Sequence, residues 1–355
     1  MPEQPGWNKL PPKYTIEQLL VDLDLLDVTG HVRKDPGQPH SLGSGAAGEV
    51  HRGLYEWTEP GTMQVVQMKV AMKYILSAPH DRIKTEEVDF AMCHNCNIQL
   101  MQNTQRIRRE VATWRYLNHP NVTEFIGIAQ IEPNRPPALV SRFMHRNKFL
   151  DYIGRHPELK REKAIEIALG LEYLHTRNPP VIHSDIKPAR FPQFRRDNIL
   201  ISDSGAAQLN DFGASRILDV QGFTTKVMRN MRYTAPELLP MAEIQEDPQP
   251  TTQSDIFSLA MLLLVLFNHR HNIELQSSIP YNHVRLVNDN GSNETKLLRR
   301  IHAGERPIRE RYPTINDGGI WETIQICWQP FPSQRPRISQ VVPLLLSLSD
   351  SIMTS

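Results

Sequence analysis

Three polar side chains between residues 183 and 213 are of the kinds that phosphoryl transfer requires. The carboxylate of Asp185 can accept a proton from an attacking hydroxyl group. The amide oxygen of Asn198 and the carboxylate of Asp211 are hard oxygen ligands, which suit Mg²⁺. An apolar run after Asn198 predicts a short strand, and a turn then returns the chain to Asp211. The pattern predicts one site with a proton acceptor and two metal ligands.

Three glycines near the N-terminus could cover the phosphates of a nucleotide. Gly43, Gly45 and Gly48 are followed by residues that predict a strand rather than a helix, so they should lie in a hairpin. A hairpin without side chains can lie over phosphates with its backbone N–H groups pointing at them. A simple tight turn is the alternative, because the glycine pattern alone is weak evidence.

A lysine and a glutamate are expected to meet beside these glycines. The strand predicted over residues 65–75 places Ala71 and Lys73 on one face, where Ala71 leaves room for an adenine ring and Lys73 reaches the phosphates. A helix predicted over residues 103–117 carries Glu110 on its apolar face. Because an unpaired buried carboxylate is costly, Glu110 should pair with Lys73, unless it lies exposed at the edge of that face.

The composition narrows the class of protein. The 355 residues suit one large two-lobed domain or two small ones, and 39% apolar residues can form a sizeable core. The balance of 40 basic and 39 acidic residues favours neither nucleic acid nor an anionic membrane as a partner. Three cysteines do not form a disulfide framework, no signal peptide is visible, and the longest apolar run is too short to span a bilayer. We therefore expect a cytoplasmic protein, with the nucleus as the other compartment.

Two other segments are open to more than one interpretation. Thr15 is predicted to start a short amphipathic helix, which either packs on the neighbouring domain or docks a partner. Cys93 and Cys96 form a C-x-x-C pair in a long connection, and a surface loop is favoured over zinc because two further ligands at matching spacing are not visible.

These segments together resemble the protein kinase family, in its tyrosine-kinase-like group. The resemblance covers residues 37–349 and rests on ordered motifs, which are Gly-Ser-Gly-Ala-Ala-Gly-Glu-Val50, Val-Ala-Met-Lys73, His-Ser-Asp185-Ile-Lys187, Asp211-Phe-Gly and Ala-Pro-Glu237. It implies an α+β, two-lobed protein-kinase fold with a small antiparallel β-rich N-lobe and a large α-helical C-lobe. The implied boundaries are an N-terminal extension over residues 1–36, an N-lobe over about 37–141, a C-lobe over about 145–349 and a tail over 350–355.

The resemblance also implies the cofactors and the roles of individual residues. ATP and Mg²⁺ are the expected cofactors, and protein hydroxyls are the expected substrates. Asp185 and Lys187 are implied to be catalytic, and Asn198 and Asp211 to bind the metal. The implied nucleotide-binding residues are Gly43, Gly45, Gly48, Val50, Ala71, Lys73, Glu110, the gatekeeper Ser141, the hinge residues Phe143 and Met144, and Leu200. Asp255 is implied to hold the backbone of the catalytic loop, and Arg335 to pair with Glu237.

The chain departs from the family pattern at two places in the catalytic loop. Asn198 follows Asp185 by 13 residues, eight more than the motif allows, and removing Ala189–Arg196 restores the motif. This insert leaves open a catalytically impaired kinase fold that acts as a nucleotide- or partner-binding scaffold, or an error in the gene prediction. Ser184 replaces the usual arginine, so activation by phosphorylating Thr224 or Thr225 is not expected.

Two signals about the acceptor hydroxyl disagree. Lys187 is typical of serine/threonine kinases, whereas the stretch at Asn230 is closer to that of tyrosine kinases. Lys187 carries more weight because it would contact the transferred phosphate. The sequence therefore predicts an ATP-dependent serine/threonine kinase with a signalling role.

Overall fold

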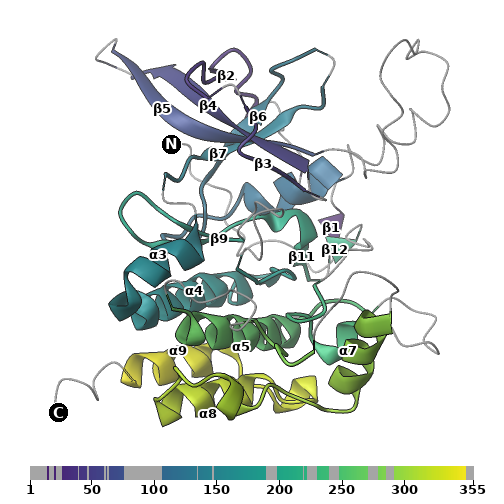
Figure 1. The fold of residues 1–355 in the computed structure, drawn as a ribbon. Coiled ribbons are helices and arrows are strands. Elements are labelled where there is room, and N and C mark those ends of the chain that lie inside the picture. The colour runs from purple at the N-terminus through teal and green to yellow at the C-terminus, as the bar shows by residue number, and fades with distance from the viewer. Residues whose placement is uncertain are drawn as a thin grey trace.

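A two-lobed α+β architecture is present in the computed structural model, as predicted. Figure 1 shows a small sheet-bearing lobe above a larger helical lobe. The structure describes residues 14–15, 20, 26–38, 40–45, 48–59, 61, 64–75, 106–133, 135–145, 148–188, 198–218, 220–221, 230–239, 248–270, 279–284 and 292–348. The predicted insert Ala189–Arg196, the Cys93–Cys96 pair, and Thr224 and Thr225 lie outside these residues.

The N-lobe is built on one antiparallel sheet. Its strands are β2 (Val32–Lys34), β3 (Gly43–Gly45), β4 (Gly48–Thr58), β5 (Val65–Tyr74), β6 (Phe125–Ala129) and β7 (Ala138–Arg142). The order is β2-β4-β5-β7-β6, with β3 paired to β4. Val70 and Met72 of β5 are buried in a small outer cluster, so Ala71 and Lys73 face the other side of the sheet, as predicted.

A helix over residues 106–114 packs against the inner side of this sheet. Its predicted apolar face is confirmed, since Ile107, Val111 and Trp114 are all buried. The indole nitrogen of Trp114 donates a 2.6 Å hydrogen bond to the carbonyl oxygen of Thr123, just before β6. This hydrogen bond fixes the C-terminal end of the helix against the sheet. Because Glu110 lies on the same helix, its position depends on this packing.

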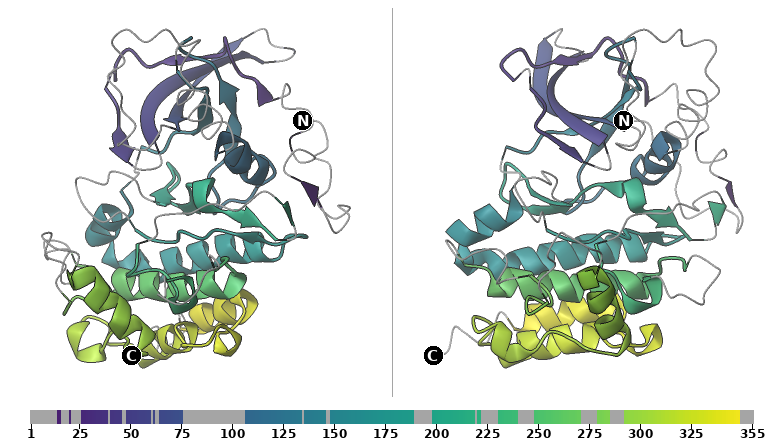
Figure 2. Two further views of the ribbon diagram at one scale, coloured as in Figure 1. Left: turned by 90° about the vertical axis from the view of Figure 1, so that its right-hand side faces the viewer. Right: turned by 45° about the vertical axis from the view of Figure 1, so that its right-hand side comes forward.

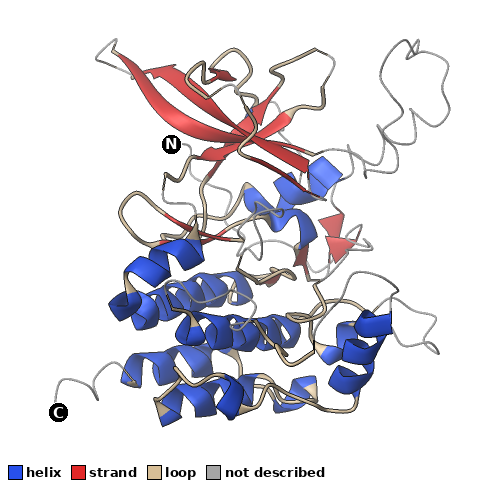
Figure 3. Ribbon diagram, viewed as in Figure 1, coloured by secondary structure: helices blue, strands red, loops and turns tan. Residues whose placement is uncertain are grey.

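The C-lobe is helical, and its central helix is buried. Figure 3 shows its helices stacked beneath the sheet: α3 (Phe149–Arg155), α4 (Lys160–His175), α5 (Thr252–Asn268), α7 (Ser292–His302), α8 (Gly318–Cys327) and α9 (Ile338–Ser347). Helix α5 begins with a capping box between Thr251 and Ser254, and from Ser254 to Asn268 every side chain is buried. Because it is apolar on all sides, α5 serves as the core of the lobe.

Short strands and turns lie between the lobes and carry the polar residues. The strands are β8 (Val181–Ile182), β9 (Ile199–Ile201), β10 (Ala207–Leu209), β11 (Arg216–Ile217) and β12 (Val220–Gln221). Strand β9 pairs with β10, and β8 pairs with β11. Single 3-10 turns complete the lobe: η4 (Pro157–Leu159), η5 (Phe212–Ala214), η6 (Pro236–Leu238), η7 (Arg309–Arg311) and η8 (Pro332–Gln334).

The N-terminal segment contributes a short strand that was not predicted. Tyr14 and Thr15 form strand β1, which pairs in parallel with β12. Most of the helix predicted after Thr15 lies outside the described residues and stays a prediction. The N-lobe sheet also begins before the predicted boundary at residue 37, since β2 already pairs with β4.

In the part of the chain that the structure describes, none of the helices combines the length and apolarity needed to cross a bilayer.

Candidate active site

The loop that carries Asp185 is held by one buried carboxylate. Asp255, in the first turn of α5, is fully buried and accepts hydrogen bonds of 2.8 Å from the backbone N–H groups of His183 and Ser184. It also accepts a 2.9 Å bond from Nε2 of His175, at the end of α4. The predicted anchoring of the loop backbone by Asp255 is therefore confirmed. His175 was not predicted, although its place at the last turn of a helix next to this loop was a usable signal.

Ser184 adopts an unusual backbone conformation next to Asp185. Its φ is +70°, in the left-handed region that side-chain-bearing residues seldom adopt. Its hydroxyl oxygen is buried and has no hydrogen-bond partner among the described residues. The backbone N–H of Ser184 is held by Asp255 in this conformation, immediately before Asp185.

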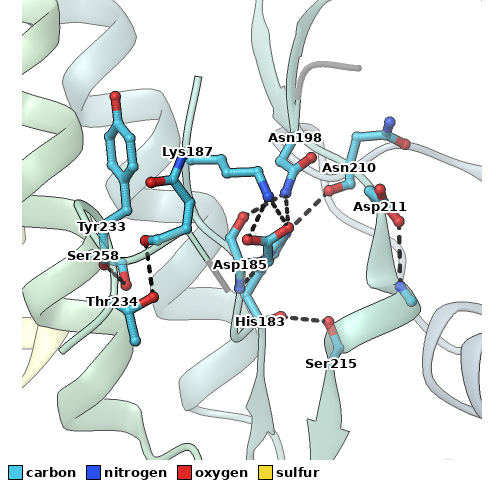
Figure 4. Close-up of polar contacts among 12 residues, drawn as sticks. His183, Asp185, Lys187, Asn198, Asn210, Asp211, Ser215, Tyr233, Thr234 and Ser258 are labelled. Atoms are coloured by element: carbon cyan, nitrogen blue, oxygen red, sulfur yellow. Dashed lines mark hydrogen bonds and ion pairs between the residues drawn. The ribbon is translucent and has the colours of Figure 1, made fainter. Parts of the chain in front are cut away.

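Asp185, Lys187 and Asn198 form one polar cluster, drawn in Figure 4. The ammonium group of Lys187 lies 2.7 and 2.5 Å from the two carboxylate oxygens of Asp185. Nδ2 of Asn198 donates to a carboxylate oxygen of Asp185 at 2.7 Å and to its backbone carbonyl at 2.5 Å. The two ends of the catalytic loop therefore meet although the insert separates them in sequence.

The position of Asn198 is set by the strand that follows it. Asn198 is buried, and the next residues form β9, whose Ile199 and Ile201 are fully buried. The backbone N–H of Asn210, after β10, donates to the carbonyl oxygen of Asn198 at 2.9 Å. A hairpin of two packed strands thus fixes Asn198 independently of the length of the preceding loop.

Lys73 connects the nucleotide side of the site to the metal side. Its ammonium group contacts the carboxylate of Glu110, as predicted, and lies 2.6 Å from Oδ1 of Asp211. Lys73 and Glu110 are buried, which strengthens charge-assisted bonds between them. The direct contact with Asp211 was not predicted, because only the tertiary fold brings β5 and the turn at residue 211 together.

A row of tilted aromatic rings supports this arrangement. Phe212 is buried with its ring centroid 5.6 Å from that of Trp114 and 5.4 Å from that of His183. The ring centroid of Trp114 also lies 5.4 Å from that of Phe125 of β6. The row therefore runs from the sheet through the helix of Glu110 to the catalytic loop, and aromatic pairs at such distances are stabilising.

The predicted glycine hairpin is confirmed as β3 and β4. Gly45 pairs with Gly48, whose φ is +127°. A Cβ atom at Gly48 would lie 1.9 Å from the carbonyl oxygen of Tyr74, so a side chain cannot be accommodated there. This close approach sets the hairpin directly against the end of β5, beside Lys73.

The remaining predicted nucleotide-binding residues lie on neighbouring strands. In the strand registers, Val50 is paired with Lys73, and Ala71 with Ser141. Ser141 is buried, as are Phe143 and Met144 just after β7, while Leu200 is half-buried on β9. Leu200 faces away from its buried neighbours Ile199 and Ile201. The contacts of these predicted nucleotide-binding residues with a nucleotide stay predictions.

The segment after the catalytic residues is tied down by two arginines. The side chain of Arg335 is fully buried and donates to both carboxylate oxygens of Glu237 at 2.7 and 2.8 Å, which confirms the predicted pair. Arg232, which the sequence analysis did not single out, is buried and donates to the carbonyl oxygens of Pro280, Tyr281 and Val284. In the sequence, the only signal for Arg232 was its place between the apolar residues Met231 and Tyr233.

The metal-binding prediction fits the donor atoms that are present. Nδ2 of Asn198 is turned toward Asp185, so the amide oxygen is directed the other way, and Asp211 presents a carboxylate. Among the described residues, no group of three His, Cys, Asp or Glu side chains is arranged to hold a metal ion. Two oxygen ligands suit Mg²⁺, which keeps waters and takes its other ligands from phosphates rather than from a complete protein cage.

Comparisons with known proteins agree with this geometry. The protein kinase domain family matches residues 38–343. The chain is 26% identical over 245 residues to "Serine/threonine-protein kinase STY17" of Arabidopsis thaliana, which covers 68% of this chain and 37% of the relative. It is 30% identical over 251 residues to "LRR receptor kinase SERK2" of Oryza sativa subsp. japonica, covering 67% of this chain and 38% of the relative.

A third relative extends over more of the chain. "Serine/threonine-protein kinase STY46" of Arabidopsis thaliana is 23% identical over 320 residues, covering 88% of this chain and 44% of the relative. The chain thus spans less than half the length of these three relatives, and what it shares with them is the kinase domain. Since the family match covers most of the chain and the ordered motifs meet in one site, the chain belongs to the protein kinase domain family.

Proposed function

We propose that this protein is a catalytically active kinase, which transfers the γ-phosphoryl group of ATP to serine or threonine hydroxyls of protein substrates. One observation carries the proposal: Asn198 donates to Asp185 at 2.7 Å although the insert lies between them. A displacement of about 1 Å at such a site can cost about 10²-fold in rate. The contact supports a catalytic geometry that is kept despite the insert.

Each polar residue of the site has a defined task in this reaction. Asp185 orients the acceptor hydroxyl and takes its proton at a carboxylate oxygen. Lys187, which lies against the same carboxylate, stabilises negative charge on the group being transferred. Lys73 holds the α- and β-phosphates and is itself oriented by Glu110. Asn198 and Asp211 would hold Mg²⁺, which would supply positive charge to neutralise the phosphates.

The proposed acceptor is serine or threonine rather than tyrosine. Lys187 contacts the carboxylate of Asp185 directly, which supports a role for it beside the transferred phosphate. Two of the reported relatives carry serine/threonine-protein kinase in their names, which supports the same assignment. The stretch at Asn230, whose backbone oxygen accepts hydrogen bonds from the N–H groups of Tyr233 and Thr234, is the one signal that favours tyrosine.

The second candidate is a kinase fold that has lost transfer and binds nucleotide or partners. Its support is Ser184, which replaces the family's arginine, and the eight-residue insert in the catalytic loop. Both candidates retain Lys73, Glu110 and Asp211 for nucleotide binding, so binding of ATP alone does not separate them. Transfer of phosphate does.

The test is phosphate transfer from labelled ATP with Mg²⁺ to a generic basic protein and to the chain itself. Asp185→Asn, made in parallel, should lower the rate by about 10²–10⁴-fold, because it removes the proton acceptor. Asp203→Asn is the matched control, since the Asp203 side chain is 55% exposed in the turn after β9. Phosphoamino-acid analysis of the product then separates serine and threonine from tyrosine.

Absence of transfer by a folded native chain would contradict the proposal. The same assay on a chain lacking residues 189–196 then distinguishes the two remaining explanations. Transfer by the shortened chain would show that the insert blocks the reaction or comes from an error in the gene prediction. Continued absence of transfer would support the scaffold.

A further inference from the structure

A cluster of charged and aromatic side chains lies on the outer face of the N-lobe sheet, at the base of the glycine hairpin. Glu49 directly follows Gly48 and is paired with Tyr74 of β5, which belongs to the outer apolar cluster. Residues paired across two strands present their side chains on the same face. The next pair, Val50 and Lys73, therefore lies on the other face, where the nucleotide is expected. Figure 2 shows the long strands β4 and β5 curving together above the C-lobe.

Arg135 joins this cluster from the connection between β6 and β7. Its Nη2 donates to Oε2 of Glu49 at 2.7 Å, and its guanidinium carbon lies 4.6 Å from the ring centroid of Tyr74. A planar guanidinium can rest on an aromatic face and donate to a carboxylate at the same time. One side chain thus contacts both the residue after Gly48 and the residue after Lys73.

The backbone of Arg135 is itself held in its turn. Its N–H donates to the carbonyl oxygen of Glu132 at 3.1 Å, and its carbonyl oxygen accepts a 2.8 Å bond from the side chain of Gln130. The N–H of Gln130 donates to the hydroxyl oxygen of Thr29 at 2.9 Å. The side chain of Arg135 therefore reaches the hairpin from a fixed point of the sheet.

The Glu49–Arg135 pair is more shielded from solvent than an ordinary surface pair. The side chains of Glu49 and Arg135 are 19% and 27% exposed. Those of Glu56 and Arg33, which pair toward the other end of β4, are 38% and 53% exposed. Burial opposes the ionisation of Glu49, but the contacts with Arg135 and His51 outweigh it and hold the pKa of this carboxyl below its usual range. The shielded pair should therefore hold the hairpin more firmly than an exposed pair would.

We propose that Arg135 is a positioning residue for ATP, which acts through Glu49 to hold the glycine hairpin over the phosphates. The glycines allow the backbone to approach phosphates, but they also remove side chains that could hold the hairpin in place. Glu49 provides the first side chain after Gly48, and it meets Arg135 on the face away from the nucleotide. The inference rests on the proposed function only in that ATP is the nucleotide bound.

The main variant is Arg135→Met in the full chain, which keeps an apolar side chain beside Tyr74 and removes the charge that holds Glu49. The dissociation constant for ATP with Mg²⁺, measured by titration calorimetry, should rise about three- to tenfold, because one charge-assisted hydrogen bond is lost. The dissociation constant for adenosine, which has no phosphates, should stay within about twofold of the native value. A variant that had only lost stability would not separate ATP from adenosine in this way.

Glu49→Gln tests the same contact from the other side, with a side chain of the same size. It should raise the dissociation constant for ATP by a similar factor. Glu49→Gln combined with Arg135→Met should raise it no further than the single changes, because both remove one contact. Additive effects would overturn the action of Arg135 through Glu49. Since glutamine keeps the shape of glutamate, this variant decides the inference even if Arg135→Met does not fold.

Arg33→Met is the matched control, because it breaks an arginine–glutamate pair on the same strand away from the hairpin. Both of its dissociation constants should stay within about twofold of the native values. An equal loss of ATP affinity in this control would overturn the inference, as would unchanged ATP affinity in Arg135→Met.

The transfer assay separates this inference from the proposed function. If the native chain transfers phosphate, Arg135→Met should raise the KM for ATP with kcat within about twofold, since Asp185 and Lys187 are untouched. A fall in kcat at unchanged KM would overturn the inference. If the native chain binds ATP but transfers no phosphate, the proposed function fails, and the dissociation constants still support or reject the role of Arg135. A native chain that does not bind ATP would overturn both.

Discussion

The two halves of the site are held in place by different kinds of contact. The loop with Asp185 is fixed through its backbone, by hydrogen bonds from His183 and Ser184 to the buried carboxylate of Asp255. The helix with Glu110 is fixed through side chains, by the packing of its apolar face and the contact with Lys73. Backbone hydrogen bonds to a buried helix allow little movement, whereas side-chain packing allows a helix to shift as a body.

This difference separates the two parts of the proposed reaction. The proton acceptor should be in place whether or not a nucleotide is bound, while the phosphate-holding lysine depends on an element that can be displaced. Regulation by other parts of the chain is therefore expected to act on the helix and not on the catalytic loop. Changes on each side should accordingly be separable by hydrogen exchange.

On the helix side, the largest effect is expected from Lys73→Met. The change leaves the carboxylates of Glu110 and Asp211 without the ammonium group that lies between them, so the helix should move away. Transfer should fall by roughly 10²–10³-fold, as for loss of one preorganised charge donor. Hydrogen exchange should increase at residues 106–114 and stay low at residues 181–186.

Lys69→Met is the control for this change. It lies on the same strand but is exposed, and its ammonium group faces His145 at 3.3 Å instead of the catalytic cluster. A rate within about threefold of the native value is expected for it. Equal losses in the two variants would mean that Lys73 acts only through the stability of β5.

For Asp255→Asn, hydrogen exchange is expected to change in the catalytic loop and not in the helix of Glu110. An amide keeps only one acceptor oxygen, so one of the two backbone N–H groups would lose its partner in a buried place. The expected cost is about 1–3 kcal/mol of unfolding free energy, with exchange increased at residues 181–186 and unchanged at residues 106–114. Thermal unfolding and hydrogen exchange on the same sample measure both quantities, and increased exchange in the helix would contradict the separation.

The Arg335–Glu237 pair belongs neither to the catalytic loop nor to the helix of Glu110, so breaking it should affect stability alone. Arg335→Leu leaves the carboxylate of Glu237 without its bidentate partner, and about 3 kcal/mol of stability should be lost, at the low end of the usual range because Glu237 is 26% exposed. Arg33→Leu breaks the exposed pair with Glu56 and should change stability by less than about 1 kcal/mol. Denaturant titration of both variants gives the difference, and similar losses would contradict the burial argument.

The smallest effect is expected from replacing Thr224 and Thr225 together by alanine. Ser184 carries no charge and cannot pair with a phosphate on this segment, so the rate should change by less than about threefold. A drop of tenfold, which corresponds to about 1.4 kcal/mol, would show that another cation has taken over the task of the family's arginine. The measurement is the initial rate of phosphate transfer at saturating ATP.

Much of the site could be read from the order of residues, because its motifs are local. The glycine hairpin, the Lys73–Glu110 pair, the hold of Asp255 on the catalytic loop and the Arg335–Glu237 pair were all predicted and are present. The pairing of Thr15 with Gln221 was not predicted, because it depends on a strand partner far away in the chain. Arg232 and His175 were missed because their partners are distant carbonyl oxygens and a distant carboxylate.

The sequence by itself determined the identity of the chemical groups, the faces of β5 and the buried helix α5, which are properties of neighbouring residues. The two-lobed fold was predicted through the resemblance of the ordered motifs to those of protein kinases. Only the tertiary structure decided two things. It brought Asn198 to Asp185 across the insert, because the packed hairpin of β9 and β10 fixes Asn198 whatever the loop length. It also paired residues 14–15 with β12 and Asp27 with β6, because such backbone pairing depends on partners that lie far away in the chain.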